Sequence, residues 1–267
     1  MKIAFIGGGN MGEAILAAML NKKLAISKDI TVSDVSKARR HYLMQKYFIA
    51  VSTNNIEAIK DKDIILLAIK PQTLTDITTE LKGHLKPNQL VISIIAGARL
   101  GRLTEGLNHH SIVRSMPNTP AQIGEGVTMW TTTKEVTEEQ KKTAGTILGA
   151  MGKEFYANDE GMLDRATAVS GSGPAYLFLF IEAMTDAAVK IGLPREMAKE
   201  MVLGTVLGSS HLVVQSGKEP AELRRMVTSP GGTTAEAITT FEKGGFAELV
   251  YQAIKAAYEK SQKLGQG

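Results

Sequence analysis

Short apolar runs alternate with segments of helical periodicity up to about residue 160 of the chain. A continuous apolar run that stops at a glycine, a proline or a charged residue is typical of a strand buried on both faces of a parallel sheet. Such runs predict strands at residues 3–6, 29–33, 49–51, 64–68, 90–94 and 112–114, an added strand at 126–132, a helix at 138–151 and a closing strand at 153–156. The alternation predicts an α/β fold with a doubly wound, mostly parallel sheet.

From about residue 160 the pattern changes to helices alone. Apolar residues at helical spacing, with glycine, proline or serine in the gaps, predict helices at residues 161–168, 174–191, 194–215, 233–243 and 246–263. We therefore predict two domains, an α/β domain at residues 1–159 and an all-α helical domain at residues 160–267.

The helices of the second half have little polar surface on some turns. Residues 201–208, Met-Val-Leu-Gly-Thr-Val-Leu-Gly, carry no charge on any face. Helices of this kind bury more than one face, which a domain of this size does with difficulty on its own. The pattern favours a homo-oligomer, with a compact monomeric bundle as the alternative.

A glycine-rich turn joins the first predicted strand to the helix that follows it. Residues 7–12 read Gly-Gly-Gly-Asn-Met-Gly and match the G-x-G-x-x-G fingerprint of Rossmann domains. In that fingerprint Gly7 makes the tight turn, Gly9 lets the main chain approach a pyrophosphate, and Gly12 lets the helix pack close to the strand. An ordinary glycine turn is the alternative, but the position between a strand and a helix favours dinucleotide binding.

The residues after the second predicted strand give conflicting indications about the cofactor. Asp34 stands where an acidic residue hydrogen-bonds the ribose hydroxyls of NAD. Lys37 and Arg39 follow, where a cation can meet the 2′-phosphate of NADP. We expect both cofactors to work, with a moderate preference for NADPH. Asp34 or Ser36 capping the next helix is a compatible interpretation.

The composition of the chain favours some classes of ligand and location over others. The chain has 267 residues, of which 43% are hydrophobic and 22% charged, and its net charge of +4 is spread along the sequence rather than gathered in a basic stripe. This favours small anionic ligands and argues against nucleic acid. No apolar stretch is long enough to cross a membrane, and the first strand leaves no room for a signal peptide, so we expect a cytoplasmic protein.

Metal and disulfide chemistry find no support in the sequence. The chain has no cysteine, and its five histidines are scattered. Neither Ser-His-Asp spacing nor a paired-carboxylate motif stands out, so chemistry carried by a cofactor is the simplest hypothesis.

Two further glycine-rich turns open predicted helices in the second half. They are Ser-Gly-Ser-Gly-Pro-Ala-Tyr at residues 170–176 and Thr-Ser-Pro-Gly-Gly-Thr-Thr-Ala at residues 228–235. Each places hydroxyl groups and free main-chain N–H groups at the amino end of a helix, which suits a substrate carboxylate. Helix capping alone is the alternative.

Together these segments closely resemble the pyrroline-5-carboxylate reductase family over the whole chain. The matching segments are FIGGGNMG at residues 5–12, LAIKPQ at 67–72, RSMPNTP at 114–120, VSGSGPAY at 169–176 and VTSPGGTT at 227–234. The resemblance implies reduction of 1-pyrroline-5-carboxylate to L-proline by NADPH or NADH. It also implies a helical dimerisation and substrate-binding domain, a homodimer, and in some members a larger ring of dimers.

The resemblance also implies roles for individual residues. For the cofactor these are Ile6, Gly7, Gly8, Gly9, Asn10 and Met11 in the first turn, Ala68, Ile69, Lys70 and Pro71 after the fourth strand, Asp34, Ser36 and Asn55 near the adenosine half, and Ile94, Ile95 and Ala96 near the nicotinamide. For the substrate they are Ser229, Gly231, Gly232, Thr233 and Thr234, with Thr234 nearest the chemistry.

The chain departs from the family's sequence pattern at one position, and two alternative functions are open. Family members often carry arginine after position 34, where this chain has Val35, which puts NADP preference in doubt. A β-hydroxyacid dehydrogenase resembles the 171–173 turn but needs a catalytic lysine and asparagine where this chain has Leu177 and Ile181. A non-catalytic nucleotide sensor is the other alternative, and it leaves residues 228–234 without a task.

Overall fold

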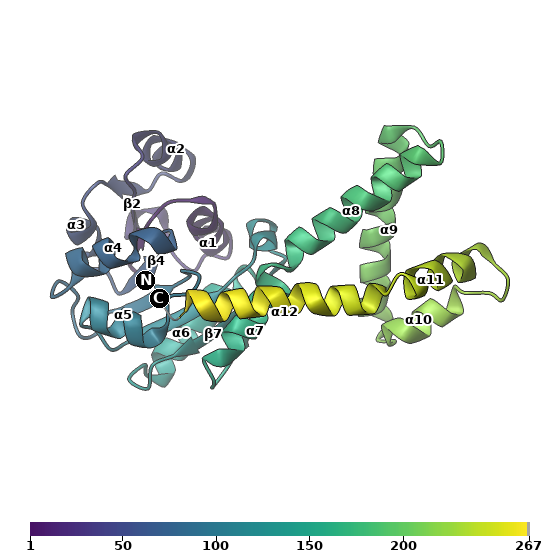
Figure 1. The fold of residues 1–267 in the computed structure, drawn as a ribbon. Coiled ribbons are helices and arrows are strands. Elements are labelled where there is room, and N and C mark those ends of the chain that lie inside the picture. Colours follow the sequence, from purple (N-terminus) through teal and green to yellow (C-terminus); the bar gives the residue numbers. More distant parts are fainter. Residues whose placement is uncertain (266–267) are drawn as a thin grey trace. The chain divides into compact units, whose positions relative to one another are not determined.

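The computed structural model describes residues 1–265, which form two compact units (Figure 1). Unit 1 contains residues 1–172 together with the C-terminal residues from 257, and unit 2 contains residues 173–256. The return of the chain end to unit 1 has no counterpart in the local sequence pattern. The predicted division into independent domains at residues 159 and 160 stays a prediction.

Unit 1 is built on one eight-stranded sheet with the order β3-β2-β1-β4-β5-β6-β7-β8. Its strands are β1 (Ile3–Ile6), β2 (Ile30–Ser33), β3 (Ala50–Ser52), β4 (Ile64–Leu67), β5 (Leu90–Ser93), β6 (Ile112–Met116), β7 (Gly126–Thr132) and β8 (Gly152–Tyr156). All neighbouring pairs are parallel except β6 and β7. The predicted doubly wound, mostly parallel sheet is confirmed.

Helices cover both faces of this sheet in unit 1 (Figure 1). The α-helices are α1 (Asn10–Asn21), α2 (Lys37–Tyr47), α3 (Asn55–Ile59), α4 (Leu74–Leu81), α5 (Leu100–Leu107), α6 (Glu138–Gly149) and α7 (Gly161–Ala166). Short 3₁₀ turns occur at η1 (Ser27–Asp29), η2 (Pro71–Thr73) and η3 (Thr119–Ile123), and a π-helical turn at η4 (Thr167–Gly171) follows α7.

The central strands are buried on both faces because their side chains alternate between two cores. Ile3 and Phe5 of β1 join α1 and α6 in one core, whereas Ala4 and Ile6 join α3, α4 and α5 in the other. This explains why the strands read as continuous apolar runs rather than as an alternating pattern.

Unit 2 consists of helices. They are α8 (Gly173–Lys190), α9 (Arg195–Ser216), α10 (Pro220–Met226), α11 (Thr233–Lys243) and the first part of α12 (Phe246–Leu264), whose residues from 257 belong to unit 1. Helix α10 was not predicted, because seven residues are too few for a helical period to stand out. The predicted all-α region is otherwise confirmed, and the bounds of α11 agree with the prediction.

A buried carboxylate ties four segments of unit 1 together. Asp164 of α7 accepts hydrogen bonds from Arg99 before α5 (2.9 Å), from Arg114 of β6 (3.5 Å) and from Ser261 near the end of α12 (3.0 Å). Glu160 lies 2.7 Å from the other side of the Arg114 guanidinium. The side chains of Asp164 and Arg114 are only 2% and 4% exposed, so both charges depend on this cluster of ion pairs for compensation.

We expect Asp164→Asn to destabilise unit 1 by about 3 kcal/mol, because it leaves a buried guanidinium with one carboxylate instead of two. This lies at the low end of values for breaking buried ion pairs, since Glu160 still accepts from Arg114. Urea unfolding followed by the fluorescence of Trp130, the single tryptophan of the chain and part of unit 1, measures the change.

The matched control is Asp61→Asn, which removes one partner of the exposed Lys86–Asp61 pair. It should leave the urea midpoint nearly unchanged, because exposed pairs contribute little. Equal midpoints for the Asp164 and Asp61 variants would contradict the role assigned to Asp164.

Candidate functional site

The loops after four strands meet at one edge of the unit 1 sheet. The register pairs Ile6 at the end of β1 with Ser33 of β2 and Leu67 of β4, and Leu67 with Ser93 of β5. The sheet order runs from β1 to β2 on one side and to β4 on the other, so the direction of winding reverses beside β1. Such a switch point is where open α/β sheets bind ligands.

Glycine is required or tolerated at positions 7, 9 and 12 of the first turn for three different structural reasons. Gly7 has a φ of +96°, and a Cβ there would lie 2.4 Å from the main-chain oxygen of Ala68. A Cβ on Gly12 would lie 2.8 Å from the main-chain oxygen of Gly7, so α1 could not approach β1. A Cβ on Gly9 would meet nothing within 4 Å, which leaves open space in front of this residue.

This open space lies at the amino end of α1. The helix begins at Asn10, and the N-cap Gly9 has no side chain to satisfy the first N–H groups. Free N–H groups and the positive end of the helix dipole favour a phosphate. The turn therefore has the space and the N–H groups that the pyrophosphate of a dinucleotide needs, and the assignment of residues 7–12 to the cofactor stays a prediction.

Asp34 is held against the glycine turn. Its carboxylate accepts hydrogen bonds from the main-chain N–H groups of Gly8 and Ser36, both at 2.8 Å. Ser36, rather than Asp34, is the N-cap of α2, since its hydroxyl accepts from the N–H of Arg39 at 3.2 Å. The cap and the carboxylate beside the nucleotide turn are thus two compatible features of neighbouring residues.

A second carboxylate, Glu13 of α1, is linked to Gly8 through Arg39, which donates to both. It accepts from Arg39, from Lys46 at 2.9 Å, from Tyr47 at 2.8 Å and from Tyr42 at 3.1 Å. Burial by itself raises the pKa of Glu13, but the hydrogen bonds from Lys46, Tyr47 and Arg39 outweigh burial and lower the pKa to about 2.

Glu13 is not among the site residues predicted from the sequence. The available signal was an acidic residue directly after the glycine fingerprint, facing a basic helix. A carboxylate at that place is expected to interact with cations of α2, but only the structure shows which ones.

The other predicted cofactor residues lie in different surroundings. Ala68 closes the back of the Gly7 turn, and Ile69 packs against the second core. Ile95 is buried in that core as well, and its main chain is hydrogen-bonded to the Ser93 hydroxyl (3.3 Å) and to the N–H of Ala98 (3.2 Å). Asn55, after β3, donates to Glu80 at 2.7 Å. The remaining residues, Lys70, Pro71, Ile94 and Ala96, lie in the loops after β4 and β5 at the same sheet edge.

The predicted substrate turn opens α11 in unit 2. Gly231 has a φ of +67°, and the N–H of Gly232 donates to the main-chain oxygen of Ser229 at 3.1 Å. Gly232 is the N-cap and has no capping side chain, so the first N–H groups of α11 have no partner within the helix. Thr234 is half-buried in this first turn, whereas Thr233 is exposed.

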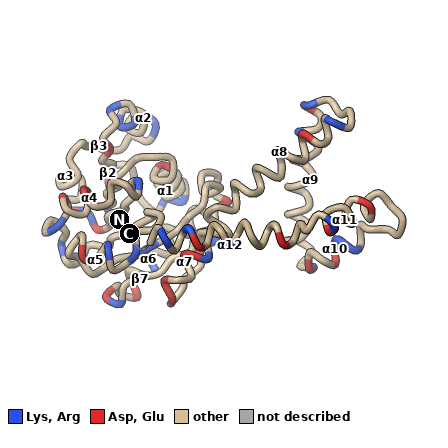
Figure 2. The backbone as a smooth tube through the Cα atoms, in the orientation of Figure 1, with Lys and Arg blue, Asp and Glu red and all other residues tan. Residues whose placement is uncertain are grey.

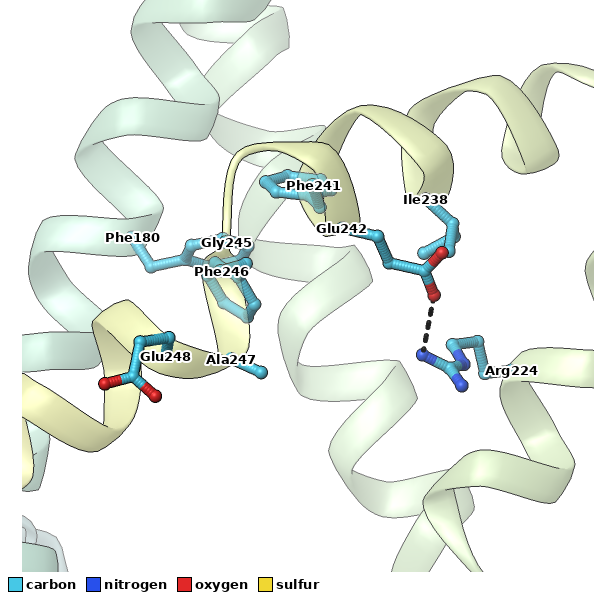
Figure 3. A pocket seen from close by; sticks show the side chains of 9 residues that line it. All are labelled: Phe180, Arg224, Ile238, Phe241, Glu242, Gly245, Phe246, Ala247 and Glu248. Atoms are coloured by element: carbon cyan, nitrogen blue, oxygen red, sulfur yellow. Dashed lines mark ion pairs between the residues drawn. The ribbon is translucent and has the colours of Figure 1, made fainter.

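Unit 2 also contains an apolar pocket beside α11 (Figure 3). Phe180, Phe241 and Phe246 form its floor, with ring centroids 5.4 Å apart for Phe241 and Phe246. Arg224 of α10 and Glu242 of α11 lie 3.8 Å apart at its rim. None of the predicted site residues lines this pocket.

Residues 1–265 contain neither a candidate metal centre nor a candidate membrane span. No group of three or more metal-ligating side chains occurs among these residues. In the same part of the chain no helix is long and apolar enough to cross a membrane. The cytoplasmic location expected from the sequence stays a prediction.

Comparison with known proteins agrees with this arrangement. Residues 2–97 match the family described as NADP oxidoreductase coenzyme F420-dependent, and residues 160–264 match pyrroline-5-carboxylate reductase dimerisation. Pyrroline-5-carboxylate reductases of Synechocystis sp. and Pseudomonas aeruginosa are 42% and 41% identical, over 99% of this chain and 98% and 97% of theirs.

A solved structure gives the same result. Plasmodium falciparum pyrroline carboxylate reductase with NADP bound has a TM-score of 0.90 and 35% identity, covering 99% of this chain and 98% of that one. The likeness extends over both units and not over the nucleotide-binding half alone. The chain belongs to the pyrroline-5-carboxylate reductase family.

Proposed function

We propose that this protein reduces 1-pyrroline-5-carboxylate to L-proline with NADPH or NADH. The observation that carries the proposal is full-length similarity to pyrroline-5-carboxylate reductases, which includes both the nucleotide turn and the turn that opens α11. Loss of nicotinamide absorbance with purified protein and DL-pyrroline-5-carboxylate tests it. Nucleotide binding without turnover would favour the sensor alternative.

In this proposal unit 1 holds the cofactor. The N–H groups at the start of α1 bind the pyrophosphate in the space before Gly9, Asp34 faces the adenosine ribose, and the loops after β4 and β5 contact the nicotinamide half. The reduced nicotinamide supplies the hydride for the imine carbon. The protein itself then has to hold and orient the cofactor and the substrate and to exclude water, which explains why no strong acid or base motif occurs.

The turn that opens α11 holds the substrate. Its free N–H groups bind the carboxylate, and the hydroxyl of Thr234 donates to the ring nitrogen. Such a hydroxyl stabilises charge that changes on the nitrogen during reduction. A threonine has no proton of suitable acidity, so solvent or prior protonation of the imine supplies the proton.

The functional assembly in this proposal is a homodimer formed by unit 2, and association of dimers into a ring is its extension. Charged residues are absent from positions 201–217 of the sequence, and few are seen along the middle of α9 in Figure 2. On α9, Met201 and Leu207 are 56% and 59% exposed in the single chain. Apolar side chains exposed in this number mark an interface, and the matching family description names dimerisation.

We expect Gly9→Val to weaken binding of both NADH and NADPH at least tenfold, because a branched side chain would occupy the space that the pyrophosphate needs. The fold should survive, since Gly9 has an ordinary φ of −64° and no neighbour within 4 Å. Fluorescence titration of the reduced cofactors measures affinity, and thermal unfolding measures stability. Gly101→Val, also in open space, is the control. Parental affinity in the Gly9 variant would mean that the turn has another role.

Thr234→Val should lower kcat roughly 10- to 1,000-fold, because it keeps the shape of the side chain and removes one positioned donor. Cofactor affinity and oligomer size should not change. Steady-state kinetics measures the effect. The control is Thr240→Val in the same helix, where the hydroxyl donates to the main-chain oxygen of Glu236. An unchanged kcat in the Thr234 variant would leave Thr234 as part of the helix start only.

Leu207→Glu should shift the protein toward the monomer and lower its activity, because it places a charge in the proposed interface. Sedimentation velocity over a range of concentrations measures the assembly, and its mass distinguishes a dimer from a ring. Ile26→Glu changes an apolar residue of similar exposure, 52%, in unit 1 and should keep the parental mass. A parent protein that is an active monomer would refute the proposed assembly.

A further inference from the structure

Two carboxylates are linked to Gly8, Asp34 directly and Glu13 through Arg39, and together they bear on which cofactor the site accepts. Asp34 accepts from the N–H of Gly8, and the carbonyl of Gly8 accepts from Arg39, which is also paired with Glu13. These contacts decide whether Arg39 is free to bind a 2′-phosphate. This inference rests on the proposed cofactor site.

Arg39 is committed on three sides. Its Nε donates to Gly8, its Nη2 donates to Glu13, and its guanidinium carbon lies 5.1 Å from the centre of the Tyr42 ring. The side chain of Arg39 is 22% exposed and that of Glu13 is 15% exposed, so solvent weakens this pair less than a surface pair. A 2′-phosphate could recruit Arg39 only by competing with Glu13.

The other nearby cations do not replace Arg39. Arg40 donates through Nη1 to the main-chain oxygen of Asp34 at 2.6 Å. Lys37 is exposed at the first position of α2, and its flexible, strongly hydrated ammonium group binds a phosphate less specifically than the planar fork of a guanidinium. Figure 2 shows that α2 is rich in Lys and Arg, so the number of cations is not what limits the site.

A 2′-phosphate carries about −1.5 to −2 charges at neutral pH, whereas a 2′-hydroxyl is neutral and can donate to a carboxylate. Beside Gly8 the phosphate would meet the carboxylate of Asp34. The hydroxyl of NADH avoids that repulsion and finds an acceptor in Asp34.

We propose that Glu13 is a specificity-determining residue that withholds Arg39 from the 2′-phosphate and makes the site prefer NADH over NADPH. The sequence alone led to the opposite expectation, because it shows Lys37 and Arg39 but not the partner of Arg39. Glu13 is a positioning residue here, since it acts on the cofactor through Arg39.

The test compares equilibrium dissociation constants of NADH and NADPH without substrate, by fluorescence titration at low ionic strength. The parent should bind NADH more tightly. Glu13→Gln keeps an oxygen acceptor for the tyrosines and Lys46 but removes the charge, so NADPH should bind about three- to tenfold more tightly relative to NADH. Added salt should reduce the parental preference.

Two further variants separate specificity from structure. Glu139→Gln removes the same charge from the first turn of another unit 1 helix and should leave the ratio as in the parent. In an Arg39→Met background, Glu13→Gln should give no comparable gain, because no guanidinium is left to release.

Each outcome has one meaning. A parent that binds neither nucleotide would refute the proposed cofactor site itself. A parent that prefers NADPH, an unchanged ratio in Glu13→Gln, or an equal gain in the Arg39→Met background would overturn the role of Glu13. Weaker binding of both nucleotides by Glu13→Gln would make Glu13 a structural residue and would overturn it as well.

Discussion

The sheet edge where the cofactor is proposed to bind depends on the close contact between Gly7 and the main chain of Ala68. A side chain at Gly7 would overlap that carbonyl, and a side chain at Gly12 would overlap Gly7 in turn. These two contacts bring the end of β1, the start of α1 and the loop after β4 together. Because no atom fills the space before Gly9, the same packing that closes the core also leaves a cradle for a phosphate.

Local signals made most of the fold predictable. Continuous apolar runs located the central strands because those strands are buried on both faces, and the glycine spacing located the turn because each glycine answers a distinct steric demand. The bounds of α11 followed from its helical spacing and from the glycines on either side of it. Helix α10 escaped because it is short, and the return of residues from 257 to unit 1 escaped because no local pattern encodes it.

Contacts between distant segments also decide the candidate site, and the sequence alone does not show them. Asp34 and Ser36 could be placed from their distance to the glycine turn, yet the partners that decide what they do are 26 and 3 residues away. The cations of α2 were visible in the sequence, but the value of a cation for binding depends on what already neutralises it. Arg39 and Glu13 are 26 positions apart, so their pairing is a property of the fold and not of either segment.

The last helix has a consequence for how the protein is made. Ser261 and the main-chain oxygen of Gly265 supply partners for Asp164 and Arg99, which belong to the first-synthesised unit. During synthesis the sheet of unit 1 forms while these partners are still missing, since domains fold from the amino end as the chain emerges. Unit 1 therefore completes the hydrogen bonds around Asp164 and Arg99 only when the whole chain has been made. A prematurely ended product would lack the hydroxyl that donates to Asp164 and the main-chain oxygen that accepts from Arg99, which lowers the stability of unit 1 and favours its removal by cellular quality control.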